Sequence, residues 1–138
     1  VDPFGSAMHS YYSAGQLKSE GNSISEGIGQ SRITNNLVGL EVNDSFRVSD
    51  YEALTLIYDL LYKEGISVGI SAGINMAGAL KLARTLEKGS TVVTILCDHG
   101  MRYQSKLFNY NFLKEQQLPI PDWMKKSDAK LPDVLQKV

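Results

Sequence analysis

The chain has 138 residues, of which 43% are hydrophobic and 21% charged, with a formal net charge of -1. This composition is typical of a folded globular protein and argues against a disordered chain. The balanced charge argues against nucleic-acid binding through phosphate neutralisation, and no apolar run is long enough to span a bilayer. The single cysteine excludes an internal disulfide, so we expect a cytoplasmic protein.

The first third of the chain, residues 1–49, carries few periodic signals and is rich in Gly, Ser and Asn. We expect a strand end at residues 1–3, a short helix within residues 4–12, a loop at residues 23–29 and a helical turn at residues 34–37. An irregular segment of this length is unusual inside a compact domain and tends to be functional.

An amphipathic helix is predicted at residues 50–64, after a short strand at residues 44–48. Ser49 and Glu52 have the spacing of a capping box, which fixes the start of the helix. Apolar residues then recur at helical spacing, and Gly65 is a suitable stop.

An α/β architecture follows from the elements after this helix. Residues 66–70 form a short β-prone run, and residues 74–86 keep helical spacing. Residues 91–96 are β-branched and apolar throughout, which indicates a parallel strand that is covered on both faces. We expect further strands from sequence outside this chain, and a mixture of loop and one short helix at residues 103–113.

The turn at Gly69–Ala79 leads from a strand into a helix and contains many small residues. Ligands in open α/β sheets bind where strands end and helices begin. Ser71 can present a hydroxyl there, although it can also serve simply as the N-cap of the helix. In Glu26–Gln30, Gly27 and Gly29 allow the backbone to approach a ligand, but the dinucleotide-binding fingerprint is absent.

Cys97, Asp98 and His99 follow the predicted strand at residues 91–96. A cysteine at a strand end is usually a small buried hydrophobe, which we favour over a nucleophile for Cys97. Adjacent residues rarely converge on one metal ion, so we expect no metal site here. His9 stands alone in the sequence, and we interpret it as structural.

Three segments in this order resemble the cysteine synthase (O-acetylserine sulfhydrylase) family. Ser23–Gln30 is similar to the Ser-Ile-Thr-Glu-Gly-Ile-Gly-Gln loop of that family. Gly69–Gly73 is similar to its Gly-Ile-Ser-Ser-Gly turn and to the Gly-Ser-Ala-Gly turn of cystathionine β-synthase. Thr94–Asn109 resembles the strand and loop near the C-terminus of the family.

The resemblance implies a partial fold type II enzyme (tryptophan synthase β-like) that depends on pyridoxal 5'-phosphate. Residues 1–123 would be the C-terminal portion of the catalytic domain, with parallel-sheet strands and packing helices, and residues 124–138 a tail. The implied reaction is a β-replacement in which sulfide displaces the acetate of O-acetylserine to form L-cysteine. The implied partners are the amino-acid substrate, sulfide and a second copy of the parent enzyme, with no nucleic acid and no membrane.

The resemblance also assigns roles to individual residues. Ser71 matches the serine that hydrogen-bonds the pyridine nitrogen of the cofactor. Cys97 and Asp98 match positions beside the pyridine ring, where many relatives carry Pro and Ser. Gly27, Ile28 and Gly29 match the loop at the mouth of the active site, which moves when substrate binds.

No catalytic residue of the family is expected in this chain. The Schiff-base lysine, the substrate loop Thr-Ser-Gly-Asn and the phosphate cradle Gly-Thr-Gly-Gly-Thr of the family all lie N-terminal to the matching region. We therefore expect the isolated chain to be inactive. The alternatives are a cystathionine β-synthase-like enzyme, which uses homocysteine, and a non-catalytic remnant or interaction module.

Overall fold

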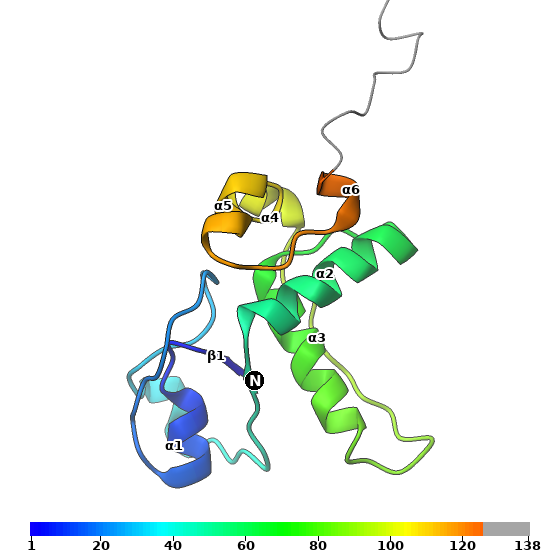
Figure 1. Cartoon of the computed structure of the whole chain (residues 1–138). Coiled ribbons are helices and arrows are strands. Elements are labelled where there is room, and N and C mark those ends of the chain that lie inside the picture. The colour runs from blue at the N-terminus through cyan, green and yellow to red at the C-terminus, as the bar shows by residue number, and fades with distance from the viewer. Residues whose placement is uncertain (126–138) are drawn as a thin grey trace, which may run out of the picture.

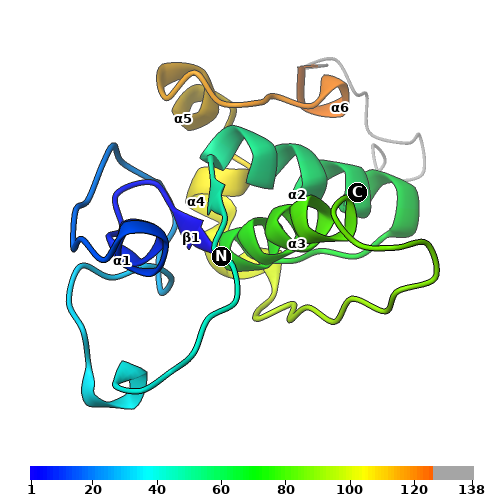
Figure 2. The same ribbon diagram turned by 90° about the horizontal axis from the view of Figure 1, so that it is seen from below.

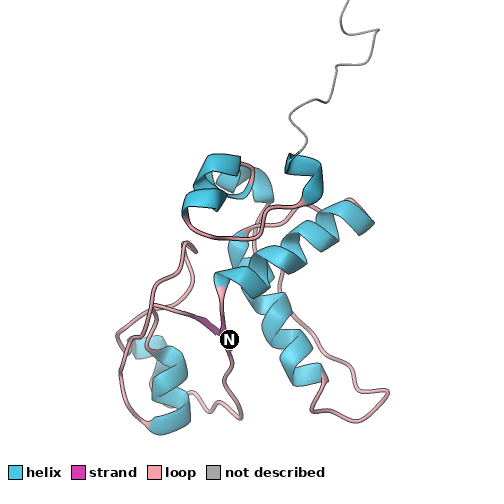
Figure 3. Cartoon of the chain, viewed as in Figure 1, coloured by secondary structure: helices cyan, strands magenta, loops and turns pink. Residues whose placement is uncertain are grey.

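The computed structural model describes residues 1–125, so the predicted tail at residues 124–138 falls almost entirely outside the described residues. Helices and long loops dominate, together with one pair of very short strands (Figure 3). In chain order the elements are β1 (Asp2–Pro3), α1 (Met8–Ala14), the 3-10 helix η1 (Asn35–Leu37), β2 (Arg47–Val48), α2 (Asp50–Glu64), α3 (Ile70–Ala83), the 3-10 helix η2 (Gly100–Tyr103), α4 (Gln104–Leu107), α5 (Tyr110–Glu115) and α6 (Asp122–Lys125).

Helix α2 begins and ends where the sequence predicts. The Ser49 side chain accepts a hydrogen bond from the Glu52 N–H, and the Glu52 side chain accepts one from the Ser49 N–H, which completes the capping box. Gly65 ends the helix in the left-handed conformation, at φ 70°. Because both ends are set by local hydrogen bonds, the bounds of this helix do not depend on tertiary packing.

Helix α3 begins at Ile70, earlier than the predicted start at residue 74. Gly69 is the N-cap and supplies no side-chain hydrogen bond, so the sequence carries no capping signal there. Ser71 lies in the first turn, and the expectation that it is the N-cap residue is wrong. Helices α2 and α3 pack against each other, as both views of the ribbon show (Figures 1 and 2).

Gly73 lies where helix α3 packs closely on helix α2. A Cβ atom built on Gly73 would lie 2.7 Å from the Ala53 carbonyl oxygen and 2.7 Å from Ile57 Cδ1. Only a residue without a side chain allows this approach. The small residues that the sequence places in this helix therefore set how deeply α3 sits on α2.

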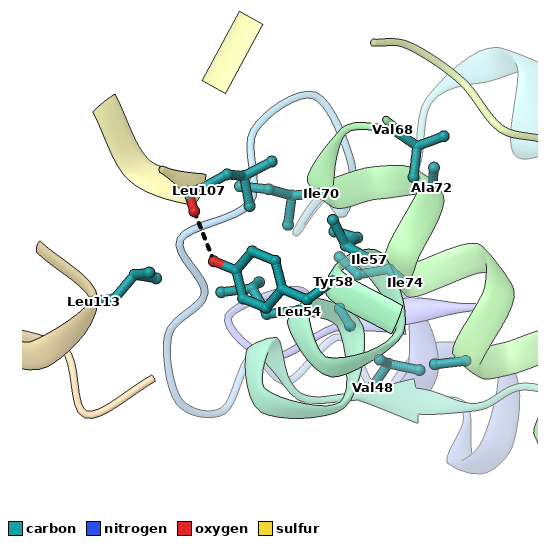
Figure 4. Packing of buried hydrophobic residues seen from close by; sticks show 12 residues of the cluster. Val48, Leu54, Ile57, Tyr58, Val68, Ile70, Ala72, Ile74, Leu107 and Leu113 are labelled. Atoms are coloured by element: carbon teal, nitrogen blue, oxygen red, sulfur yellow. Dashed lines mark hydrogen bonds between the residues drawn. The ribbon is translucent and has the colours of Figure 1, made fainter. Parts of the chain in front are cut away.

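The hydrophobic core lies between α2, α3 and the short helices α4 and α5 (Figure 4). The Tyr58 hydroxyl donates a hydrogen bond to the Leu107 carbonyl oxygen at 2.7 Å, which ties α2 to α4. Burial raises the pKa of Tyr58, so this donor keeps its proton. The largest fully buried side chains are Leu54, Ile57, Ile70, Ile74, Leu107, Leu113, Val48 and Pro3.

The N-terminal segment is attached by the parallel pair of β1 and β2, in which Asp2 lies opposite Arg47 and Pro3 opposite Val48. Asp2 is 3% exposed, and its Oδ2 accepts a hydrogen bond from the backbone N–H of His9 in α1. His9 Nδ1 in turn lies 2.8 Å from Ser45 Oγ. These contacts give His9 a structural role, as expected.

The predicted strand at residues 91–96 is wrong for this structure. The segment is extended but carries no strand pairing, and Val93 and Ile95 are 86% and 69% exposed. A strand is defined by its neighbour, and within residues 1–125 no neighbour lies along this segment. The β-prone run at residues 66–70 forms no strand either: it lies beside residues 98–100, with a backbone hydrogen bond from Gly69 N to the Asp98 oxygen, and its last residue joins helix α3.

Two other predictions hold in outline. The strand expected at residues 44–48 is shortened to Arg47–Val48, and the helical turn expected at residues 34–37 is the 3-10 helix at Asn35–Leu37. Residues 103–113 contain more helix than expected. Among residues 1–125, no helix is both long and apolar enough to cross a membrane.

Candidate functional site

A cavity of about 580 Å³ opens where the extended segment at residues 91–96 ends and helix α3 begins. This volume lies within the usual range for small-molecule sites. The loop before η1 forms one wall, and the chain between residue 97 and η2 forms the facing wall. The residues that line it are Glu26, Gly27, Ile28, Ser71, Cys97, Asp98, Arg102 and Tyr103.

Ser71 lies at the base of this cavity, in the first turn of α3. The residue is only 7% exposed, and its hydroxyl makes no hydrogen bond to any other residue in the described part of the chain. The first turn of a helix also leaves backbone N–H groups without helical partners. Ser71 is therefore a largely buried residue whose unpartnered hydroxyl is open to the cavity and free to bond a ligand atom.

Asp98 packs directly on the residue that begins α3. Its backbone oxygen accepts a hydrogen bond from Gly69 N at 2.9 Å. A Cβ atom on Gly69 would lie 2.0 Å from Asp98 Oδ1 and 2.7 Å from Tyr103 Cε2, so glycine is required for this packing. Asp98 thus fixes the start of the helix that carries Ser71.

The Asp98 carboxylate is held from its other side by Tyr103, whose hydroxyl donates to Oδ2 at 2.6 Å. This hydrogen bond, together with partial burial and the carboxylate charge, raises the pKa of Tyr103. Asp98 Oδ1 is buried and has no hydrogen-bond partner among the described residues. A buried acceptor without a donor is costly, which makes this oxygen an unsatisfied group beside the cavity.

Cys97 is exposed, and the expectation of a small buried hydrophobe is wrong. It lies at the end of a segment that has no neighbouring strand to cover it. Its Sγ is 3.4 Å from Asn75 Nδ2, and the same nitrogen donates to the Ile95 carbonyl oxygen at 3.0 Å. Asn75 of α3 thereby fixes the end of the extended segment on the helix.

The loop predicted to contact substrate contributes Gly27 and Ile28 to the cavity, but not Gly29. Gly29 faces the other way, and a Cβ atom there would lie 2.8 Å from Pro3 Cγ and 2.8 Å from Ser6 Cβ. Glycines 27 and 29 both have positive φ, at 72° and 81°. The sequence predicted that the backbone at these glycines comes close to a ligand. At Gly29 the backbone instead comes close to the N-terminal segment of the protein itself.

Arg102 and Tyr103 of η2 also line the cavity, and sequence reasoning did not select them. Both lie inside the segment Thr94–Asn109, whose similarity to a known family was visible. The sequence gives no sign that the 3-10 helix turns them back towards Ser71. Within the described residues, no group of three His, Cys, Asp or Glu side chains is arranged to hold a metal ion.

Comparison with known proteins points to one group of enzymes. Residues 1–98 match the family model described as pyridoxal-phosphate dependent enzyme. The chain is 43% identical over 133 residues to cysteine synthase 1 of Neurospora crassa, with 91% of this chain and 35% of that protein covered. It is 33% identical over 132 residues to cysteine synthase of Dictyostelium discoideum, with 88% of this chain and 35% of that protein covered.

A solved structure is also similar. The O-acetylserine dependent cystathionine beta-synthase of Helicobacter pylori matches with a TM-score of 0.66 and 33% identity, over 76% of this chain and 32% of that one. The expected α/β class and partial fold type II architecture are thereby confirmed. The chain spans about a third of the length of the curated relatives that it matches.

Proposed function

The chain belongs to the pyridoxal-phosphate dependent enzyme family, and on this premise we propose that it supplies one wall of the active site of a cysteine synthase. The reaction is the replacement of the acetate of O-acetylserine by sulfide to give L-cysteine. The observation that carries the proposal is the meeting of Ser71, Cys97 and Asp98 with Gly27 and Ile28 around one cavity. These are residues that the family resemblance selects.

The residues present fit the ring end of pyridoxal phosphate. The Ser71 hydroxyl is open to the cavity and lacks a partner within residues 1–125, so it can donate to the pyridine nitrogen without breaking an existing bond. Cys97 and Asp98 line the same cavity as Ser71 and would lie beside the ring. When bound, pyridoxal phosphate supplies an electron sink that eases loss of the substrate's β-substituent.

A neutral hydroxyl at the ring nitrogen suits this chemistry. Ser71 can donate a hydrogen bond without protonating the nitrogen, whereas a carboxylate at the same position would favour the protonated ring. Asp98 does not take that role, because its Oδ2 is occupied by Tyr103 and its Oδ1 packs on Gly69. We infer that Ser71 orients the ring and that Asp98 positions Ser71.

The loop wall at Gly27 and Ile28 covers the substrate side of the cavity and limits the entry of water. Gly27 is not packed against the rest of the protein on its Cβ side, so this part of the wall has room to shift when substrate enters. The lysine and phosphate cradle of the family have no match in this sequence. We therefore propose that turnover requires those groups from elsewhere, and that the chain alone is inactive.

A chimera tests the proposal. This chain would replace the matching 133 residues of Neurospora crassa cysteine synthase 1, and product formation from O-acetylserine would be measured with sulfide and, separately, with homocysteine. The unmodified Neurospora enzyme is the control. We expect cysteine from sulfide, together with retention of pyridoxal phosphate. A folded chimera that retains the cofactor but makes neither product contradicts the proposal.

The structural similarity to an O-acetylserine dependent cystathionine beta-synthase supports a second candidate function. In that case homocysteine takes the place of sulfide. The chimera would then have a higher kcat/KM for forming cystathionine from homocysteine than for forming cysteine from sulfide. We propose cysteine synthase first because the relatives that cover most of this chain are cysteine synthases. We also propose a homodimeric parent enzyme, and a cytoplasmic location on the ground that the single cysteine is free.

A further inference from the structure

The loop at residues 23–30 is fixed at both ends to different parts of the molecule. At its start, Asp50 of α2 accepts hydrogen bonds from Ser23 Oγ at 2.5 Å and from Ile24 N at 2.8 Å. At its end, Gln30 N donates to Ser6 Oγ at 2.9 Å. Between these two anchors, Glu26, Gly27 and Ile28 form the loop wall of the cavity.

Lys106 adds a third attachment, from the opposite side of the cavity. Its ammonium group donates to the Ile24 carbonyl oxygen at 2.8 Å and to Glu26 Oε1 at 2.5 Å. Lys106 belongs to α4, which directly follows η2, and η2 carries Arg102 and Tyr103 of the facing wall. The two bonds of Lys106 thus join the two walls.

The glycines of the loop determine where it can bend. Gly29 is packed against Pro3 and Ser6, whereas a Cβ atom built on Gly27 would have nothing within 4 Å. Gly27 directly follows Glu26, the residue held by Lys106. The loop position with open space around it therefore lies next to the residue that forms the loop's ion pair with Lys106.

We propose that Lys106 is a positioning residue that latches the loop through Glu26 and the Ile24 carbonyl group, and so sets how wide the cavity opens. The bond to a backbone carbonyl distinguishes this contact from a simple surface ion pair, which contributes little. This proposal rests on the proposed function, in which substrate enters through this cavity. The latch itself can be tested without cofactor or substrate.

Backbone 15N relaxation of the full 138-residue chain measures the latch residue by residue. In the wild type, the amides of Glu26 and Gly27 are expected to have order parameters near about 0.85, the value of a rigid backbone. In Lys106→Met they fall below about 0.6, while Gln30, held by Ser6, stays rigid. Lys106→Arg restores the wild-type values because arginine keeps the charge and the donors.

Cys97 reports the opening of the cavity, because it lies on the facing wall and is the only thiol in the chain. Because Cys97 is already exposed, its rate with a bulky maleimide is divided by its rate with a small one, and this ratio is expected to rise about two- to five-fold when the latch is lost, which is the effect of one partly exposed charged contact. Lys106→Met and Glu26→Gln change the local charge in opposite directions. If this ratio for Cys97 rises in both variants, the cause is therefore the opening of the cavity and not the change in local charge.

The latch also depends on pH. The hydrogen bond and charge of Lys106 hold the pKa of Glu26 below its usual 4.5. The other ionisable side chains that line this cavity are Cys97, Asp98, Arg102 and Tyr103. As pH falls through the lowered pKa of Glu26, the loop of the wild type becomes mobile, whereas Lys106→Met is mobile throughout.

Lys63→Met is the matched control, because Lys63 forms an exposed ion pair with Asp59 on α2, at 2.9 Å, that does not touch the cavity. The proposal is overturned if Lys106→Met leaves the order parameters of Glu26 and Gly27 unchanged, or if it changes them no more than Lys63→Met does. It is also overturned if the ratio of the two maleimide rates at Cys97 keeps its wild-type value in both latch variants. These results stand whether or not the chimera makes cysteine, so failure of the latch and failure of the proposed function are separable.

Discussion

Replacing Gly73 by alanine sets two opposing effects against each other in the helix that carries Ser71. Alanine is favoured over glycine inside a helix by about 1 kcal/mol. Against this, the new methyl group would lie 2.7 Å from the Ala53 carbonyl oxygen and 2.7 Å from Ile57 Cδ1. The carbonyl is part of the α2 backbone and cannot rotate away, so the two helices must separate.

Overpacking of this kind costs about 1–3 kcal/mol, and the rigid obstacle places Gly73→Ala at the upper end. We therefore expect a net loss of about 1–2 kcal/mol in the free energy of unfolding. Gly78→Ala is the matched control in the same helix. The atoms nearest to its methyl group belong to the Val1 side chain, the first at 2.1 Å, and Val1 is 48% exposed and can move aside, whereas the obstacle at Gly73 includes backbone. We expect Gly78→Ala to be neutral or up to about 1 kcal/mol more stable.

Urea unfolding followed by far-ultraviolet circular dichroism measures both variants, and equal m-values confirm that the same surface is exposed. The difference between them isolates the clash, because the change in helix propensity is shared. If Gly73→Ala is as stable as the wild type, or if Gly78→Ala is destabilised equally, the close approach of α3 to α2 is not what positions Ser71.

Two further predictions concern the contacts that hold α2. Tyr58→Phe leaves the buried Leu107 carbonyl oxygen without its donor, so urea unfolding should show a loss of about 1–3 kcal/mol in the free energy of unfolding. Burial also raises the pKa of Tyr58 above its usual 10.0. The wild type should therefore lose stability as pH rises above 10.0, and Tyr58→Phe should lose less. Partial burial works to raise the pKa of Glu52, but hydrogen bonds from Ser49 and Lys81 outweigh it and hold that pKa below 4.5. The contribution of the Glu52 carboxylate to the free energy of unfolding is therefore complete above pH 4.5 and is lost as pH falls through the lowered pKa. If Glu52→Gln loses stability in acid as steeply as the wild type does, this assignment is contradicted.

The elements that could be predicted from the sequence are those whose ends are fixed locally. Helix α2 is framed by the capping box of Ser49 and Glu52 and by Gly65, all visible in the sequence. The start of α3 was missed because Gly69 caps it without a side chain. The strand at residues 91–96 was wrong because strand formation depends on a neighbour, and none lies beside it within the described residues.

The candidate site shows the same division. Ser71, Cys97 and Asp98 could be selected because the segments that contain them resemble a known family, and the gathering of helix starts and strand ends at one edge of an α/β fold agrees with that choice. Arg102, Tyr103 and the latch residue Lys106 could not, because each reaches the cavity only through the path of η2 and α4. Contacts between residues 24 and 106 are tertiary, and no local pattern in the sequence encodes them.

The central claim is that the hydroxyl of Ser71 binds the ring of pyridoxal phosphate. Equilibrium dialysis of the Neurospora chimera against pyridoxal phosphate tests it most directly, with Ser71→Ala compared with Ser90→Ala, a change at an exposed serine. The account predicts that Ser71→Ala binds the cofactor about five-fold more weakly, as expected for one lost hydrogen bond, and that Ser90→Ala binds it unchanged. Equal affinity in the two variants would contradict the claim.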